Sequence, residues 1–176
     1  MWRSFLLFGF LFLVSGCSHT KPHYTHKKEQ TKPLPLKPSV QKELPPYRLH
    51  KKNPITLALY DQYVKWYGVK YCYGGENRDG IDCSALVQQV YKDAFGISVP
   101  RTTLYQAKVG YFVKKRRLKE GDLVLFKTGY NSRHSGIYLE RGNFLHSSSS
   151  HGVTISNINN PYWRARYWQS RRVIPQ

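Results

Sequence analysis

A cysteine between a Gly-rich loop and an amphipathic segment is the residue of this chain best suited to nucleophilic chemistry. Cys83 follows Asp82 and precedes an apolar pattern, Leu86 to Ala94, that predicts a helix. At a helix N-terminus, unpaired backbone N–H groups and the positive end of the helix dipole both favour thiolate over thiol. Cys83 is therefore the candidate nucleophile. The alternative is a small, buried, unreactive cysteine at the start of a helix.

Two histidines can complete such a site, because a cysteine nucleophile needs a base and the base needs an orienting group. His134 and His146 fall on neighbouring predicted strands joined at Arg141-Gly142, so their imidazoles can lie side by side in an antiparallel pair. His134 would then face Cys83, while His146 hydrogen-bonds the other ring nitrogen of His134 and fixes its tautomer. His151 falls in a predicted turn and is expected to be exposed.

The same residue types could instead bind zinc, with Cys72, Cys83, His134 and His146 as a Cys₂His₂ set. Ten residues separate the two cysteines, however, whereas about two to four is typical of a structural zinc site. No metal and no cofactor is therefore expected. The third cysteine, Cys17, lies in the leader, so the cysteines imply no disulfide framework.

Helices are predicted in the first half of the folded region. Apolar residues three or four positions apart predict a helix that ends at Gly68. These residues are Leu57, Tyr60, Val64 and Tyr67. Asp82 is suited to cap the next helix, and Gly96 to end it. A short helix capped by Thr102 or Thr103 should follow.

Strands are predicted after residue 119, where the apolar pattern changes to a period of two or to short runs separated by turn residues. The predicted strands are residues 122–127, 134–140, 143–147, 153–158 and 167–174. Helices followed by hairpin-connected strands predict an α+β domain, with the helices packed on an antiparallel sheet of about five strands.

The N-terminal residues predict export. Residues 1–16 combine Arg3 with an apolar run that is short for a membrane span but typical of a secretory signal peptide. The sequence Val14-Ser15-Gly16-Cys17 resembles the lipobox of bacterial lipoproteins, in which the cysteine is lipidated, and Ser18 implies sorting to the outer membrane. Residues 17–53 are rich in Lys, Pro, His and Gln and are expected to form a disordered tether. The folded domain is predicted over residues 54–176.

The chain is strongly basic, with 28 Lys and Arg against 10 Asp and Glu and a net charge of +18. These charges are spread along the chain, and no stripe of basic residues interleaved with exposed aromatics stands out. Together with export, this spread argues against a nucleic-acid partner. It suits an anionic polymer or a membrane surface.

Seven short motifs occur in a distinctive order over residues 55–174. They are Tyr71-Cys72-Tyr73-Gly74-Gly75, Asp82-Cys83-Ser84, Val99-Pro100-Arg101, Gly121-Asp122-Leu123-Val124, His134-Ser135-Gly136-Ile137-Tyr138, Phe144-Leu145-His146-Ser147-Ser148 and Tyr162-Trp163. This ordered set resembles that of the NlpC/P60 cysteine peptidases, and most of all the small lipoproteins of that family from Gram-negative bacteria.

The resemblance implies a papain-like α+β fold with a Cys-His-His catalytic set. Matched by motif, Cys83 is the nucleophile, His134 the general base and acid, and His146 the residue that orients His134. The backbone N–H of Cys83 is a candidate oxyanion donor. The matches at substrate-pocket positions are Tyr73, Asp82 and Ser84. Tyr73 would reach the oxyanion or a substrate amine, and Asp82 would pair with a cationic substrate group.

Two positions depart from the family pattern. Cys72 replaces a basic or polar residue before the tyrosine, and we expect its thiol to point away from Cys83. Ala85 stands where the family usually has Gly, a change that a helix tolerates.

The predicted function is that of a peptidoglycan hydrolase, a cysteine endopeptidase of stem-peptide or cross-link bonds that involve D-Glu and meso-diaminopimelate. The predicted protein is a monomer, anchored by a lipid on Cys17 to the periplasmic side of the envelope. Two alternatives stay open at this point. One is an amidase or acyltransferase on the same site, and the other is a catalytically inactive lipoprotein that binds the envelope.

Overall fold

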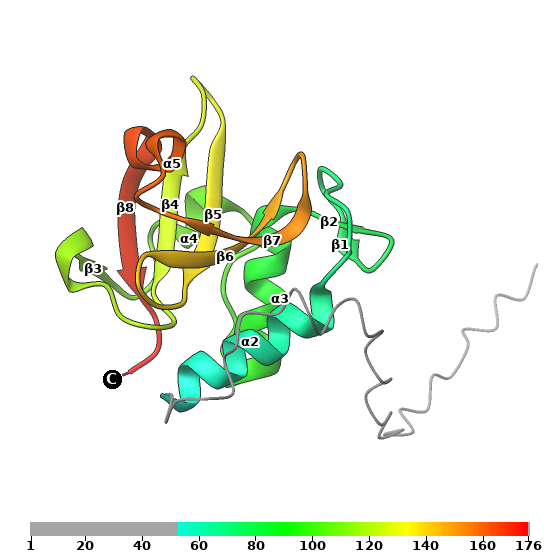
Figure 1. Cartoon of the computed structure of the whole chain (residues 1–176), viewed down its shortest axis with the longest axis horizontal. Coiled ribbons are helices and arrows are strands. Elements are labelled where there is room, and N and C mark those ends of the chain that lie inside the picture. The colour runs from blue at the N-terminus through cyan, green and yellow to red at the C-terminus, as the bar shows by residue number, and fades with distance from the viewer. Residues whose placement is uncertain (1–52, 176) are drawn as a thin grey trace, which may run out of the picture. The chain divides into compact units, whose positions relative to one another are not determined.

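The computed structural model of the chain describes residues 53–175 (Figure 1). The predicted signal peptide, Cys17 and the predicted tether up to residue 52 lie outside the described residues. In chain order the elements are α2 (Pro54–Trp66), β1 (Glu76–Asn77), β2 (Gly80–Ile81), α3 (Cys83–Phe95), α4 (Thr103–Gln106), β3 (Tyr111–Val113), the 3₁₀ helix η2 (Lys115–Arg117), β4 (Leu123–Lys127), β5 (Arg133–Tyr138), β6 (Asn143–Ser148), β7 (Gly152–Asn157), α5 (Pro161–Arg166) and β8 (Tyr167–Arg172). Within these residues, none of the helices has the length and apolar character that crossing a membrane requires.

Capping residues determine where the two long helices begin and end. The Asn53 side chain accepts a hydrogen bond from the Ile55 backbone N–H at the start of α2. At the start of α3, Asp82 Oδ1 accepts from the Ala85 backbone N–H at 2.8 Å. Gly96 ends α3 in the left-handed conformation, with φ of 67°. Both caps of α3 were predicted from the sequence.

The face that α2 buries differs from the predicted one. Tyr60 is buried as expected, but Leu57 is 39% exposed. The remaining buried residues of the helix are Thr56, Leu59, Tyr63 and Trp66. A stripe that contains Tyr63 and Trp66 removes more apolar area from water than one with Val64, so the helix turns this stripe toward the core.

The main sheet has six antiparallel strands in the order β3-β8-β4-β5-β6-β7. Figure 1 shows β3 at one end of the sheet and β7 at the other. The α+β class is confirmed, and β3 is an additional strand that the sequence did not predict. Only Val113 of its three residues is buried, so β3 lacks an alternating pattern. The helix α5 separates β7 from β8, which therefore do not form a hairpin.

The two faces of the sheet contribute to different apolar clusters, because successive side chains of a strand point to opposite faces. Leu123, Ile137 and Leu145 join residues of α2 and α3 in the larger cluster. The smaller cluster contains Val124, Phe126, Phe144 and Ile158, with Trp163 of α5 packed against it. The smaller cluster surrounds the two histidines described below.

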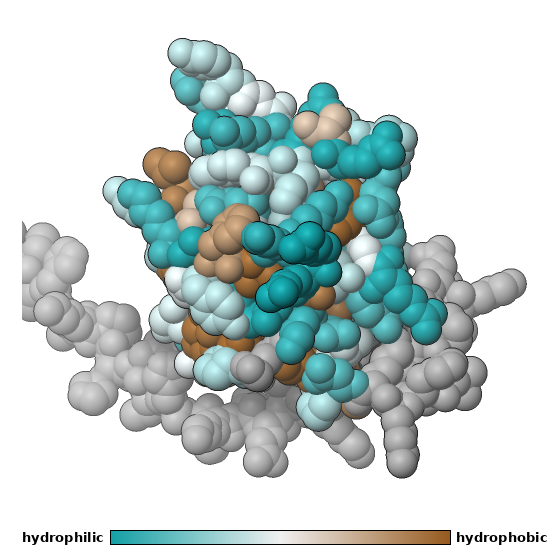
Figure 2. All heavy atoms as spheres, turned by 90° about the vertical axis from the view of Figure 1, so that its left-hand side faces the viewer, coloured by the Kyte–Doolittle hydropathy of each residue, from teal (hydrophilic) through white to brown (hydrophobic). Residues whose placement is uncertain are grey.

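The surface on the β3 side of the domain is mostly hydrophilic, with separate apolar areas between the polar ones (Figure 2). Tyr111 and Phe112 of β3 are each 56% exposed. They are followed in the chain by exposed Lys114, Arg116 and Arg117. The densest run of basic residues therefore lies at the surface, beside exposed aromatic side chains.

Candidate active site

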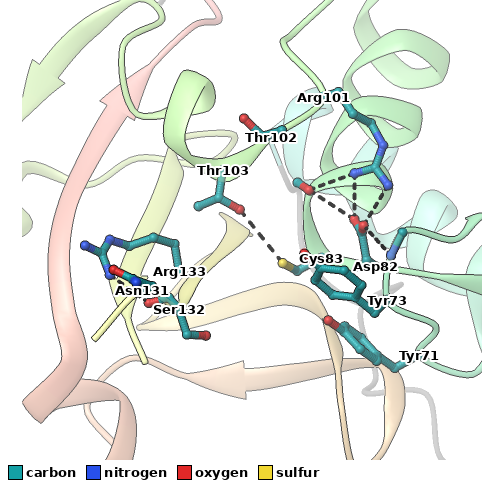
Figure 3. A pocket seen from close by; sticks show the side chains of 12 residues that line it. Tyr71, Tyr73, Asp82, Cys83, Arg101, Thr102, Thr103, Asn131, Ser132 and Arg133 are labelled. Carbon is teal, nitrogen blue, oxygen red and sulfur yellow. Dashed lines mark hydrogen bonds and ion pairs between the residues drawn. The ribbon is translucent and has the colours of Figure 1, made fainter. Parts of the chain in front are cut away.

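Cys83 occupies the first position of α3, and its side chain is buried against α4 and β5. Its Sγ atom lies 3.9 Å from Thr103 Oγ1, which in turn is 3.3 Å from Ser135 Oγ. The backbone of Ser135 also hydrogen-bonds the thiol. In Figure 3 the hydroxyl of Thr103 points toward the sulfur atom. The thiol is thus held between the start of one helix and the strand that carries His134.

Burial raises the pKa of the Cys83 thiol, and the nearby Asp82 carboxylate raises it further. Hydrogen bonds from Ser135 and Thr103 lower the pKa but do not reverse the shift. Burial is the largest of these effects, so the pKa of Cys83 shifts toward the neutral thiol, opposite to the thiolate expected at a helix N-terminus.

His134 and His146 are hydrogen-bonded to each other, with His134 Nε2 2.9 Å from His146 Nδ1. This contact is the one that the predicted strand pairing implied. Burial lowers the pKa of His134 to about 4. Burial and the proximity of His134 lower the pKa of His146 well below its ordinary value. Both rings are therefore neutral near pH 7, and one ring donates a hydrogen bond to the other.

Aromatic rings fix the orientation of the histidine pair. Trp163 of α5 lies with its ring centroid 5.1 Å from the centroids of both His134 and His146. Phe144 stacks on His146 at 4.7 Å, with an interplanar angle of 27°. Phe126, which lies on β4, packs against Trp163. This enclosure both desolvates the imidazoles and restricts their rotation.

Gly136 gives β5 and β6 the close approach that the histidine pair needs. An added Cβ atom at this position would lie 2.7 Å from Phe144 Cδ2, 2.8 Å from the Leu145 carbonyl oxygen and 3.2 Å from His146 Cβ. A side chain at residue 136 would therefore push the strand that carries His146 away from His134.

Two cavities of about 550 and 540 Å³ meet at Cys83. Tyr71, Ser132 and Arg133 also contribute to both cavities. The first cavity, shown in Figure 3, contains the three predicted pocket residues Tyr73, Asp82 and Ser84. The second contains His134, His146, Ser148, Ser156 and Trp163. The thiol thus lies where an extended ligand could pass on both of its sides, and it shares the second cavity with the histidines.

Asp82 is paired within the chain, so the predicted pairing with a cationic substrate group stays a prediction and would compete with Arg101. Arg101 Nη2 donates to Asp82 Oδ2 at 2.6 Å, and Arg101 Nη1 donates to Oδ1 at 3.0 Å. The backbone N–H of Gly74 donates to Oδ2 at 3.1 Å. Burial raises the pKa of Asp82, but hydrogen bonds from Arg101, Ala85 and Ser84 outweigh this and hold the pKa below its ordinary value. Asp82 is therefore ionised, and its carboxylate connects the start of α3 with Arg101 and Gly74.

The other two predicted pocket residues differ sharply in exposure. Ser84 is buried, and its hydroxyl donates to Asp82 and accepts from Arg101. Tyr73 is 91% exposed at the rim of the first cavity. Of the three, Tyr73 is the one most open to an incoming ligand.

Cys72 and Cys83 are both free thiols, and Cys72 is exposed whereas Cys83 is buried. The Cys72 side chain packs over Gly75 and Gly80, where an added Cβ would meet it. Cys83 lines both cavities, whereas Cys72 lines neither.

Several site residues were not recognised as such in the sequence. Arg101 and Trp163 belong to the seven ordered motifs, but the sequence assigned them no role. Thr103 was predicted only as a possible helix cap. Ser156 carried no signal at all, because its contact with His146 depends on the pairing of β6 with β7. Ser135 directly follows the candidate base His134, and this adjacency was its signal in the sequence.

The fold and the site define a class of α+β proteins in which a buried cysteine at a helix N-terminus shares a cavity with a histidine pair. The family model described as the NlpC/P60 family matches residues 68–172, and the chain belongs to this family. Among its relatives is the murein DD-endopeptidase MepS/murein LD-carboxypeptidase of Escherichia coli (strain K12), 47% identical over 120 residues. This alignment covers 68% of the chain and 64% of the relative, so the chain spans less than two thirds of that protein's length.

Two further proteins support the family assignment. The probable endopeptidase NlpC of Escherichia coli (strain K12) is 38% identical over 163 residues, which cover 92% of the chain and 93% of the relative. Among solved structures, an NlpC/P60 family protein from Bacillus cereus aligns with a TM-score of 0.62 and 31% identity. That alignment covers 68% of this chain and 40% of the other.

Proposed function

We propose that the chain is a cysteine endopeptidase that hydrolyses peptide bonds of peptidoglycan stem peptides. The observation that carries this proposal is the buried Cys83 thiol, which shares one cavity with the hydrogen-bonded pair His134 and His146. Two relatives are named as endopeptidases, one of them of murein. The candidate bonds are the γ-D-glutamyl–meso-diaminopimelate bond and the cross-link formed by diaminopimelate.

The hydrogen bond between the two histidines indicates which nitrogen of His134 is available as a base. His134 uses Nε2 to contact His146, so Nδ1 is the nitrogen left to accept the thiol proton. As that proton moves to Nδ1, Cys83 Sγ attacks the substrate carbonyl carbon, and the carbonyl oxygen becomes an oxyanion near the Cys83 backbone N–H. The resting pair is neutral thiol and neutral imidazole, so the thiol proton has to pass to His134 in the course of the reaction.

The second half of the reaction restores the enzyme. His134 gives the proton on Nδ1 to the departing amine, the C–N bond breaks, and a thioester to Cys83 remains. Water then attacks the thioester carbonyl while His134 Nδ1 accepts its proton. The C–S bond breaks, and the sulfur regains a proton from His134. The products are an amine and a carboxylate, and no cofactor is required.

The test is release of peptides from defined muropeptides by the full chain in detergent. Cys83→Ala should abolish release, because the attacking sulfur is removed. Cys72→Ala is the matched control, since it removes the exposed thiol of the loop that precedes α3 and should leave release unchanged. Circular dichroism of both variants checks the fold. Full activity of a folded Cys83→Ala variant would refute the proposed mechanism.

Mass spectrometry of the products identifies the bond that is broken. Cleavage between two amino acids of the stem or cross-link supports an endopeptidase. Cleavage of a bond outside the peptide would instead support an amidase or acyltransferase on the same site. Absence of any product with the wild-type chain would favour an envelope-binding lipoprotein.

We also propose that the chain is a monomer anchored by acyl chains on Cys17 to the periplasmic side of the outer membrane. The support is the sequence Val14-Ser15-Gly16-Cys17, followed by Ser18. Metabolic labelling with palmitate and fractionation of the envelope test this directly. Cys17→Ala should lose the label and leave the outer-membrane fraction, and a labelled Cys17→Ala variant would refute the anchor.

A further inference from the structure

Ser156 makes the second polar contact of His146. The His146 ring is buried, with its Nδ1 bonded to His134 and its Nε2 lying 2.9 Å from Ser156 Oγ. Ser156 belongs to β7, two positions from Thr154, which is paired directly with His146. Alternate residues of a strand share a face, so Ser156 reaches His146 diagonally across the strand pair.

The direction of these two hydrogen bonds determines which nitrogen of His134 can act as a base. If His146 donates from Nε2 to Ser156 Oγ, its Nδ1 is an acceptor and must receive the Nε2 proton of His134. His134 Nδ1 is then unprotonated and can take the proton of Cys83. If His146 instead carries its proton on Nδ1, His134 Nε2 becomes the acceptor and Nδ1 is blocked by a proton.

We propose that Ser156 is a positioning residue, which accepts a hydrogen bond from His146 Nε2 and thereby keeps His134 Nδ1 free to act as the base. This inference rests on the proposed function and names a residue that acts through two histidines. The Ser156 side chain lines the cavity that contains Cys83 and His134. Its own hydroxyl hydrogen can therefore point into the cavity, while its oxygen faces the imidazole.

His134, His146 and Ser156 form a hydrogen-bonded relay. Its last member, the Ser156 hydroxyl, is uncharged, which matters when a positive charge forms on His134 during attack. When His134 becomes an imidazolium ion, the Nδ1 lone pair of His146 faces it, and the Ser156 oxygen stabilises the matching tautomer of His146. A hydroxyl supplies this orientation without a buried negative charge. Ser156 should thus affect the rate of the chemical step and leave substrate binding unchanged.

Steady-state kinetics of the full chain on muropeptides test the relay. Ser156→Ala should lower kcat about ten- to hundredfold with KM unchanged, because a wrongly protonated histidine is a known cause of large losses in kcat. Ser156→Thr keeps the hydroxyl and should restore most of kcat. Thr154→Ala is the matched control on the same strand and should leave kcat unchanged.

The pH profile and imidazole ¹⁵N NMR separate positioning from a general structural effect. In the wild-type chain the ¹⁵N shifts should show the proton of neutral His146 on Nε2, and in Ser156→Ala part of it should move to Nδ1. The variant's loss in kcat should persist across the pH range where both rings are neutral. An unchanged tautomer together with unchanged kcat would overturn the inference, as would an equal loss in Ser156→Thr.

The Cys83→Ala experiment distinguishes failure of the Ser156 inference from failure of the proposed function. If Cys83→Ala is inactive but Ser156→Ala retains full kcat, the relay is wrong and the endopeptidase stands. If Cys83→Ala is active, the proposed function fails, and the tautomer measurement still decides whether Ser156 orders the histidine pair.

Discussion

Arg101 holds the carboxylate of Asp82 through two nitrogens, with Nη2 2.6 Å from Oδ2 and Nη1 3.0 Å from Oδ1. The same Oδ1 atom caps α3 at the Ala85 backbone N–H. One side chain therefore both starts the helix that presents Cys83 and fixes the wall of the first cavity.

This double role predicts a graded effect of substitutions at Asp82. Asp82→Ala should lower the free energy of unfolding by about 1–2 kcal/mol from loss of the cap alone, and by more because Arg101 is left half-buried without its main partner. Asp82→Asn should lose less, since an amide oxygen can still accept from the Ala85 backbone N–H. Urea unfolding of both variants measures the difference. Equal losses would show that the ion pair, and not the cap, provides the stability.

The buried histidines predict that stability falls between pH 6.5 and pH 4. The pKa of His134 is lowered from 6.5 to about 4 in the folded chain, so in this range the unfolded chain binds more protons. Unfolding therefore becomes easier as the pH falls, by roughly 3 kcal/mol at most from His134, at about 1.4 kcal/mol for each pKa unit. The lowered pKa of His146 acts in the same direction.

Urea unfolding at pH 7 and pH 4.5 measures this loss. His134→Gln should lose less stability than the wild-type chain over the same interval, because the titrating ring is gone. His151→Gln should also lose slightly less, because the nearby His151 contributes to the lowered pKa of His146. A wild-type chain whose stability is flat from pH 7 to pH 4.5 would contradict the prediction.

The two thiols of the folded domain should differ in their rates of alkylation. Cys72 is exposed, whereas Cys83 is buried and its pKa is raised. Iodoacetamide at pH 7.5 should therefore label Cys72 first and Cys83 much more slowly, as read from peptide masses over time. In urea the two rates should converge. Faster labelling of Cys83 in the folded chain would mean that the helix N-terminus, and not burial, dominates its reactivity.

Local signals in the sequence predicted the elements that carry the site. Asp82 and Gly96 define the ends of α3 through their own backbone preferences, which do not depend on distant segments. The alternation within β5 and β6 placed His134 and His146 on one face, so their hydrogen bond could be anticipated.

Features that depend on distant segments could not be predicted in the same way. The pKa of Cys83 is set by burial against α4 and β5, which no local pattern reports. β8 lies between β3 and β4, so the last strand is not at the edge where a chain of hairpins would place it. Ser156 resembles any other strand serine until β7 is paired with β6.

Gly136 provides the last prediction, because it lies where β5 and β6 approach most closely around the histidine pair. In Gly136→Ala the new Cβ would contact Phe144, the Leu145 carbonyl oxygen and His146, at least one of which must shift. Overpacking of this kind typically costs about 1–3 kcal/mol in the free energy of unfolding. Activity should fall further than stability explains, since the contact moves His146 away from His134. Gly129→Ala, in the loop before β5, is the milder comparison, because its new Cβ would lie 3.3 Å from a single side-chain atom, Ser132 Cβ, and it should lose less stability than Gly136→Ala. Wild-type kcat in Gly136→Ala would show that the pair tolerates displacement.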